Sequence, residues 1–103
     1  MKPHEADSLA TIEKWFSGKC DGLWEHQKGL ALTTTDNPGW LMTVDEPLDE
    51  PVFDKVITDV RERWGAECIR EPDKTKVFAG SLQNCICAVA QLLAARASHK
   101  QKL

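Results

Sequence analysis

The stretch GLALTTTDNPGWLMTVD at residues 29–45 decides the fold class of this 103-residue chain. Its first seven residues, 29–35, are compatible with a β-strand. In its second half, Trp40, Met42 and Val44 fall on one face of an extended chain, which is the two-residue period of a strand with one buried side. The sequence therefore predicts two strands that follow each other closely.

A turn signal separates these two runs. Asp36 and Asn37 are residue types that favour turns, and they are followed by a Pro-Gly pair. Pro38 fixes φ at one central turn position, and Gly39 can take the positive φ that a type II turn needs at the next one. We therefore predict a β-hairpin over residues 29–45.

Helical periodicity marks both ends of the chain. Ser8 can cap a helix over residues 8–17, whose apolar side chains recur at helical spacing, and Gly18 is a natural stop. Near the other end, Ser81 can cap a helix that begins at residue 82 and carries a continuous apolar stripe. No proline interrupts that second pattern through Ala97.

The middle of the chain predicts a further helix and a second hairpin. After Pro51, apolar residues repeat at i, i+4 spacing, which favours a helix over residues 52–64. Several of these residues are β-branched, so a strand over part of 52–60 is the alternative. Two β-compatible runs, 68–70 and 75–79, then flank the turn-forming residues Glu-Pro-Asp-Lys.

These elements predict one α+β domain that spans residues 1–103. We expect an antiparallel sheet of about four strands, built from two hairpins and packed against N-terminal and C-terminal helices and a middle helix. Residues 19–28 show neither the helical nor the strand spacing of apolar residues, which indicates a structured loop. Hydrophobic residues make up 42% and charged residues 28% of the chain, values typical of a globular fold.

The sequence favours a cytoplasmic protein with free thiols. No apolar run approaches the roughly 20 residues that cross a bilayer, and the polar N-terminus does not have the pattern of a signal peptide, so we expect no membrane contact. Four cysteines are too few and too unevenly spaced for a disulfide scaffold. They are Cys20, Cys68, Cys85 and Cys87.

Charge is distributed unevenly along the chain. Residues 1–54 hold 4 Lys/Arg against 11 Asp/Glu, whereas residues 55–103 hold 9 against 5, which gives net charges of −7 and +4. An acidic first half disfavours nucleic acid as a direct ligand and favours a basic partner. The alternative is that two oppositely charged surfaces attract each other within the monomer.

The sequence offers little for catalysis or for a cofactor. Cys20 and His26 are the one pair that could form a thiol nucleophile and its base. Cys85 and Cys87 are two residues apart on a predicted helix, so they point about 200° from each other and cannot share one metal ion. Glycine-rich phosphate loops are absent. We therefore expect no enzyme, no metal site and no cofactor.

The chain has four tryptophans and no tyrosine, and two short polar motifs contain tryptophan. A tryptophan in such a motif is typical either of an anchor at a protein interface or of a large side chain in the core. The motifs stand in order after an aromatic pair that ends the first predicted helix. Their residues are Trp15 and Phe16; Cys20, Asp21, Gly22, Trp24, Glu25 and His26; and Asp36, Asn37, Pro38, Gly39 and Trp40. This pattern resembles the immunity protein 53 family of bacterial polymorphic-toxin systems.

The resemblance implies an immunity protein that binds a protein toxin domain and blocks it without catalysis. We expect Glu25 and His26 to hold their loop together through hydrogen bonds to the backbone. The acidic run 45–54 should be an exposed connection, and its acids should face a basic toxin together with the hairpin end and with Trp24 or Trp40 as an anchor. The expected acids are Asp36, Asp45, Glu46, Asp49 and Glu50.

Two functions of other classes are also compatible with the sequence. A small cysteine-dependent enzyme would use Cys20 and His26, and it requires a lowered pKa at the thiol. A regulatory module that binds a small molecule would line a pocket with its tryptophans. The sequence leaves the oligomeric state open.

Overall fold

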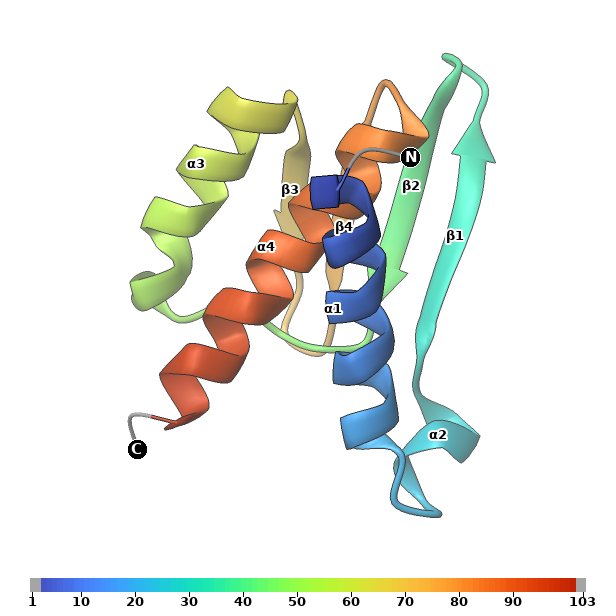
Figure 1. Cartoon of the computed structure of the whole chain (residues 1–103), viewed down its shortest axis with the longest axis vertical. Helices are drawn as coiled ribbons and strands as arrows, with labels where there is room; N and C mark the ends of the chain where they lie inside the picture. The colour runs from blue at the N-terminus through green and yellow to red at the C-terminus, as the bar shows by residue number, and fades with distance from the viewer. Residues whose placement is uncertain (1–2, 102–103) are drawn as a thin grey trace.

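The computed structural model describes residues 3–101, and it describes the side-chain surroundings of residues 7–98. Helices and strands are both present, and the α+β prediction is confirmed. Figure 1 shows their arrangement. The elements are α1 (Pro3–Lys19), α2 (Trp24–Gln27), β1 (Leu30–Thr35), β2 (Gly39–Val44), the 3-10 turn η1 (Pro51–Phe53), α3 (Asp54–Trp64), β3 (Glu67–Arg70), β4 (Thr75–Ala79) and α4 (Leu82–Gln101).

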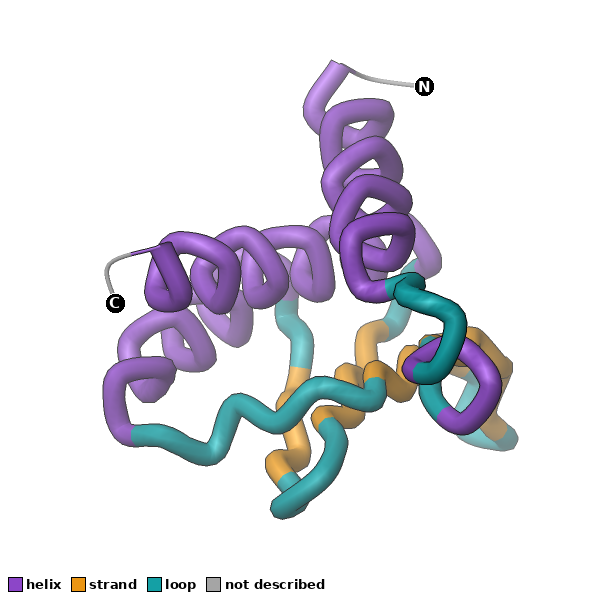
Figure 2. The backbone as a smooth tube through the Cα atoms, turned by 90° about the horizontal axis from the view of Figure 1, so that it is seen from below, coloured by secondary structure: helices purple, strands orange, loops and turns teal. Residues whose placement is uncertain are grey.

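The four strands form one antiparallel sheet in the order β1-β2-β4-β3. Each predicted hairpin is present, and the two hairpins join where β2 pairs with β4, for example Met42 opposite Val77. Figure 2 shows α1, α3 and α4 on the same side of the sheet. In the described part of the chain, no helix is long and apolar enough to cross a membrane.

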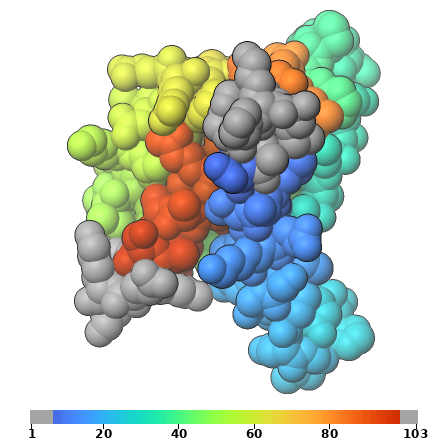
Figure 3. Space-filling view, in the orientation of Figure 1, coloured from blue at the N-terminus to red at the C-terminus, as the bar shows by residue number. Residues whose placement is uncertain are grey.

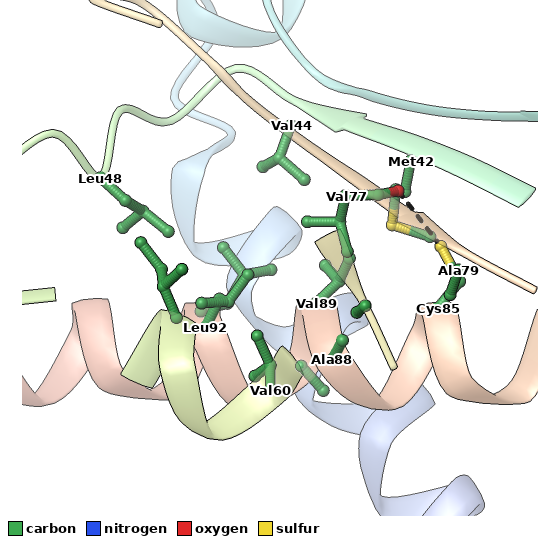
Figure 4. Packing of buried hydrophobic residues seen from close by; sticks show 14 of the residues in the cluster. Met42, Val44, Leu48, Val60, Val77, Ala79, Cys85, Ala88, Val89 and Leu92 are labelled. Atoms are coloured by element: carbon green, nitrogen blue, oxygen red, sulfur yellow. Dashed lines mark hydrogen bonds between the residues drawn. The ribbon is translucent and has the colours of Figure 1, made fainter. Parts of the chain in front are cut away.

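The core lies between α4 and the two central strands. Val89 and Leu92 on α4 are almost fully buried, and so is Val77 on β4, because α4 crosses the seam between the hairpins. Val60 brings α3 into the same cluster. Figure 4 shows how these side chains meet Met42, Val44, Leu48, Ala79, Cys85 and Ala88.

The predicted helices are present, with one change at the N-terminus. Ser8 does not cap the first helix, because α1 already begins at Pro3, a residue type that suits a first helical turn. The prediction for the last helix is confirmed, since Ser81 Oγ accepts a hydrogen bond from the Asn84 N–H at 3.1 Å. The middle segment is helical, and Gly65 ends α3 in the left-handed conformation, with φ of 65°.

The first hairpin turn forms, although its glycine does not act as predicted. Gly39 does not adopt a positive φ; it pairs with Thr35 and begins β2 in the sheet. Its small size matters instead, because a Cβ atom built there would lie 2.7 Å from Phe78 Cζ. Glycine thus allows the neighbouring strand to bring its phenylalanine ring against the hairpin backbone.

Candidate functional site

The Cys-Asp-Gly-x-Trp-Glu-His motif forms a loop that is held by its own carboxylates. Asp21 Oδ1 accepts the backbone N–H groups of Leu23 and Trp24, both at 2.9 Å. In return, the Glu25 carboxylate accepts the N–H groups of Asp21 at 2.9 Å and Gly22 at 2.8 Å. The bonds from Trp24 and Leu23 lower the pKa of Asp21. Glu25 therefore holds the loop as predicted, in the reciprocal manner of a capping box. In the described part of the chain, His26 contributes only the hydrogen bond from its backbone N–H to the Leu23 carbonyl at 3.2 Å, and not a side-chain bond as predicted.

Trp24 attaches this loop to the end of α1. Its ring meets Trp15 edge to face, with centroids 5.7 Å apart, and meets Phe16 at 5.9 Å. Trp24 is half-buried, whereas His26 is exposed on the short helix α2. The aromatic pair and the loop thus form one structural unit that directly precedes β1.

The electrostatic surroundings of Cys20 do not favour a nucleophile. The thiol is exposed, yet desolvation and then the negative charges of Glu25 and Asp21 raise its pKa. A catalytic thiol needs the opposite shift. All four cysteines are free thiols, and burial raises the pKa of Cys68 and Cys85 to about 11. Over the residues described, no cluster of three or more His, Cys, Asp or Glu side chains could hold a metal ion.

We predict that Cys20 reacts slowly with iodoacetamide near neutral pH. Because its pKa is raised, less thiolate is present at a given pH than in a free peptide. The rate should be followed by mass spectrometry from pH 7 to 10, with a synthetic peptide of residues 17–23 as control. If Cys20 in the protein were alkylated faster than the peptide at pH 7, the result would contradict the raised pKa and would support the hypothesis of a cysteine-dependent enzyme.

Glu46 is a buried carboxylate at the centre of an ion network that links three parts of the chain. Only 5% of Glu46 is exposed. Its Oε1 accepts from Lys19 Nζ at 3.1 Å, and its Oε2 accepts from Arg96 Nε at 3.3 Å. Arg96 Nη1 reaches on to Glu50 Oε1 at 3.1 Å. The network fastens the connection after β2 to α1 and α4 at once.

Further contacts fix the same acidic connection to the sheet. Thr75 Oγ1 on β4 donates to the backbone carbonyl of Glu46 at 2.8 Å. Arg70 on β3 donates to the carbonyl of Leu48 at 3.2 Å and pairs with Asp54 at 2.9 Å. The prediction of an exposed connection is therefore wrong for Glu46 and Leu48, which are buried, and right for Asp49 and Glu50.

A groove of about 450 Å³ lies between α1 and α4, with Glu46 at its wall. Trp15 and Leu93 give it an apolar lining, and Lys19 and Arg96 line it as well. Both cations are already paired with Glu46. Trp15 is the one tryptophan among its lining residues, so the tryptophan-lined pocket that the small-molecule alternative requires does not form at this groove.

The structure does not bring the predicted toxin-facing residues into one surface. Asp36 is exposed at the hairpin tip, whereas Asp49 and Glu50 follow the far end of β2, so the strand separates them (Figure 1). The Asp45 carboxylate accepts the N–H of Gly29 at 3.0 Å and closes the base of the hairpin. Trp40 packs against the core, and Trp24 packs on α1.

Sequence reasoning missed the cations that anchor the connection. Lys19 and Arg96 lie 27 and 50 residues away from Glu46 along the chain. One signal was available, because Arg96 is the only charged residue between positions 82 and 98. A charged residue on such an apolar helix indicates a partner elsewhere in the fold.

The model of the family described as Immunity protein 53 matches residues 9–86. The match therefore covers both motifs, the acidic connection and the whole sheet. Neither the curated proteins nor the solved structures contain a match.

Proposed function

Because the chain belongs to the immunity protein 53 family, we propose that it binds a cognate protein toxin domain and neutralises it without catalysing a reaction. Family membership indicates the toxin-neutralising role, and the match over residues 9–86 is the observation that carries the proposal. The raised pKa of Cys20 supports a non-catalytic role. The four free thiols suit a reducing cytoplasm, where we place this activity.

The toxin contact is placed on the outer side of the acidic connection. Asp49 and Glu50 are both exposed there, and the backbone on either side of them is fixed by Glu46, Arg70 and Phe53. Because the backbone that carries these carboxylates is held in place, ordering it costs little conformational entropy on binding, and their negative charge attracts a basic partner from a distance. A basic toxin domain therefore suits this surface, as the net charge of −7 over residues 1–54 also favours.

Growth rescue tests the proposal. Toxin domains encoded beside the gene for this chain should be expressed from an inducible promoter, with and without the intact chain. We expect one of them to stop growth alone and to be tolerated when the chain is present, with a stoichiometric complex on purification. The absence of rescue for every adjacent toxin domain would contradict the proposal.

Neutralising the connection should slow binding to that toxin. The double change Asp49→Asn and Glu50→Gln removes two exposed charges, so we expect the association rate to fall about 3- to 10-fold at low salt and its salt dependence to flatten. Stopped-flow fluorescence measures both. Glu13→Gln with Glu62→Gln is the matched control, because it removes the same charge from exposed helical positions. If both double variants slowed association equally, the acidic connection would not be part of the toxin contact.

A further inference from the structure

The two edges of the sheet differ in their protection against pairing with another strand. The β3 edge carries Glu67 and Arg70, which form ion pairs with Arg61 at 3.6 Å and Asp54 at 2.9 Å. Charged side chains of this kind are a common protection of an edge strand. The β1 edge, with the sequence Leu-Ala-Leu-Thr-Thr-Thr, has no charge and no proline.

The β1 strand is also open to solvent. Residues 31–34 are all exposed, including Leu32, whose exposed fraction of 42% is high for a leucine on the side of the sheet that carries the helices. Figure 3 shows the β1–β2 hairpin at one margin of the molecule, and Figure 1 shows β1 as its outermost strand. This edge is therefore accessible along its length.

The register shows which backbone groups point outward. The Asp45 N–H donates to the Gly29 carbonyl at 2.9 Å, so these two residues form a hydrogen-bonded pair at the base of the hairpin. Hydrogen-bonded and non-hydrogen-bonded pairs alternate along an antiparallel ladder. The N–H and C=O groups of Leu30, Leu32 and Thr34 are consequently directed away from β2.

We propose that this edge binds a second copy of the chain, with the two β1 strands antiparallel. Even-numbered residues must face each other, because they carry the outward groups. If the two-fold axis passes at Leu32, then Leu30 lies opposite Thr34 of the second copy, and each outward N–H meets a carbonyl.

This register also pairs opposite charges at both ends of the interface. Lys28 precedes β1 and Asp36 follows it, and continuing the register beyond the strand ends brings Lys28 of each chain opposite Asp36 of the other; both residues are exposed. Shifting the strands by two residues in either direction separates these charges. Charge complementarity therefore selects the second copy, in one register, as the occupant of the edge.

The resulting dimer joins two sheets into one and leaves the acidic connection free. The connection runs from the end of β2 toward α3, away from β1 (Figure 1). A single pair of six-residue strands forms a small interface, so we expect weak association, with Kd on the order of 100 µM. The dimer does not depend on toxin binding.

Sedimentation equilibrium on the purified chain alone, from about 5 to 500 µM, tests this interface. We expect a concentration-dependent dimer that Leu32→Lys weakens at least 10-fold, because two lysines then meet at the axis. Ile69→Lys is the matched control; Ile69 is 56% exposed on the β3 edge, and its change should leave the dimer intact. Circular dichroism checks that both variants fold.

A charge exchange decides the register even if Leu32→Lys fails to fold. Lys28→Asp alone should weaken the dimer several-fold, and Lys28→Asp with Asp36→Lys should restore it. A monomer throughout the concentration range overturns the proposal. A dimer whose Kd is unchanged by Leu32→Lys, or whose Kd is not restored by the charge exchange, overturns it as well. A monomer that binds a strand of the toxin at this edge would overturn self-pairing while leaving toxin neutralisation intact.

Discussion

Glu46→Gln is expected to lower the free energy of unfolding by about 2 kcal/mol. The substitution keeps the size of the side chain and removes the charge that Lys19 and Arg96 share. These cations are only 21% and 16% exposed, so water replaces the lost carboxylate poorly. The cost falls below that of a fully buried pair because both retain some solvent contact.

Urea denaturation followed by tryptophan fluorescence measures this change. Glu50→Gln is the matched control, because Glu50 contacts the same Arg96 but is 50% exposed, and its loss should cost less than about 0.5 kcal/mol. Equal stability of the two variants would show that the network contributes no more than a surface ion pair.

Phe53→Ala is expected to cost about 3 to 4 kcal/mol. Phe53 is 2% exposed and is among the largest fully buried side chains. It ends η1 just before α3, and Arg96 lies over its ring with the guanidinium carbon 5.7 Å from the centroid. The truncation therefore leaves a cavity and removes a contact of the arginine that holds Glu46.

The neighbouring residue provides the control for this substitution. Val52→Ala changes the same short turn, but Val52 is 57% exposed, so we expect a cost below about 0.5 kcal/mol. Urea midpoints for both variants give the comparison. If Phe53→Ala lowered the free energy of unfolding no more than Val52→Ala, the burial of Phe53 would contribute little to the stability of the fold.

Local patterns in the sequence predicted the elements of the fold well. The alternation around Met42, the turn at residues 36–39 and the Ser81 cap each depend on neighbours within a few residues. The order of the strands was not predictable, because the pairing of β2 with β4 joins residues far apart in the chain. Side chains of α4 pack against both strands, and the hydrophobic periodicity of a single segment does not show which strands lie side by side.

The candidate site was harder to predict than the fold. An acidic run such as residues 45–54 normally indicates a solvated connection, and Asp49 and Glu50 are indeed exposed. Glu46 is buried because distant cations surround it, and sequence spacing does not show which cations these are. The motif around Asp21 was easier to interpret, since its hydrogen bonds stay within five residues.

The attachment of Glu46 to Arg96 sets the order in which the chain becomes functional during synthesis. Arg96 follows Glu46 by 50 residues, so a ribosome has released the acidic connection well before it makes the residue that fixes it. Until α4 emerges, the connection that carries Asp49 and Glu50 is held by fewer contacts, such as those from Arg70 and Thr75 on the sheet. Under the proposed function, a nascent chain that ends before Arg96 would therefore protect less well than the full chain, even with both tryptophan motifs complete.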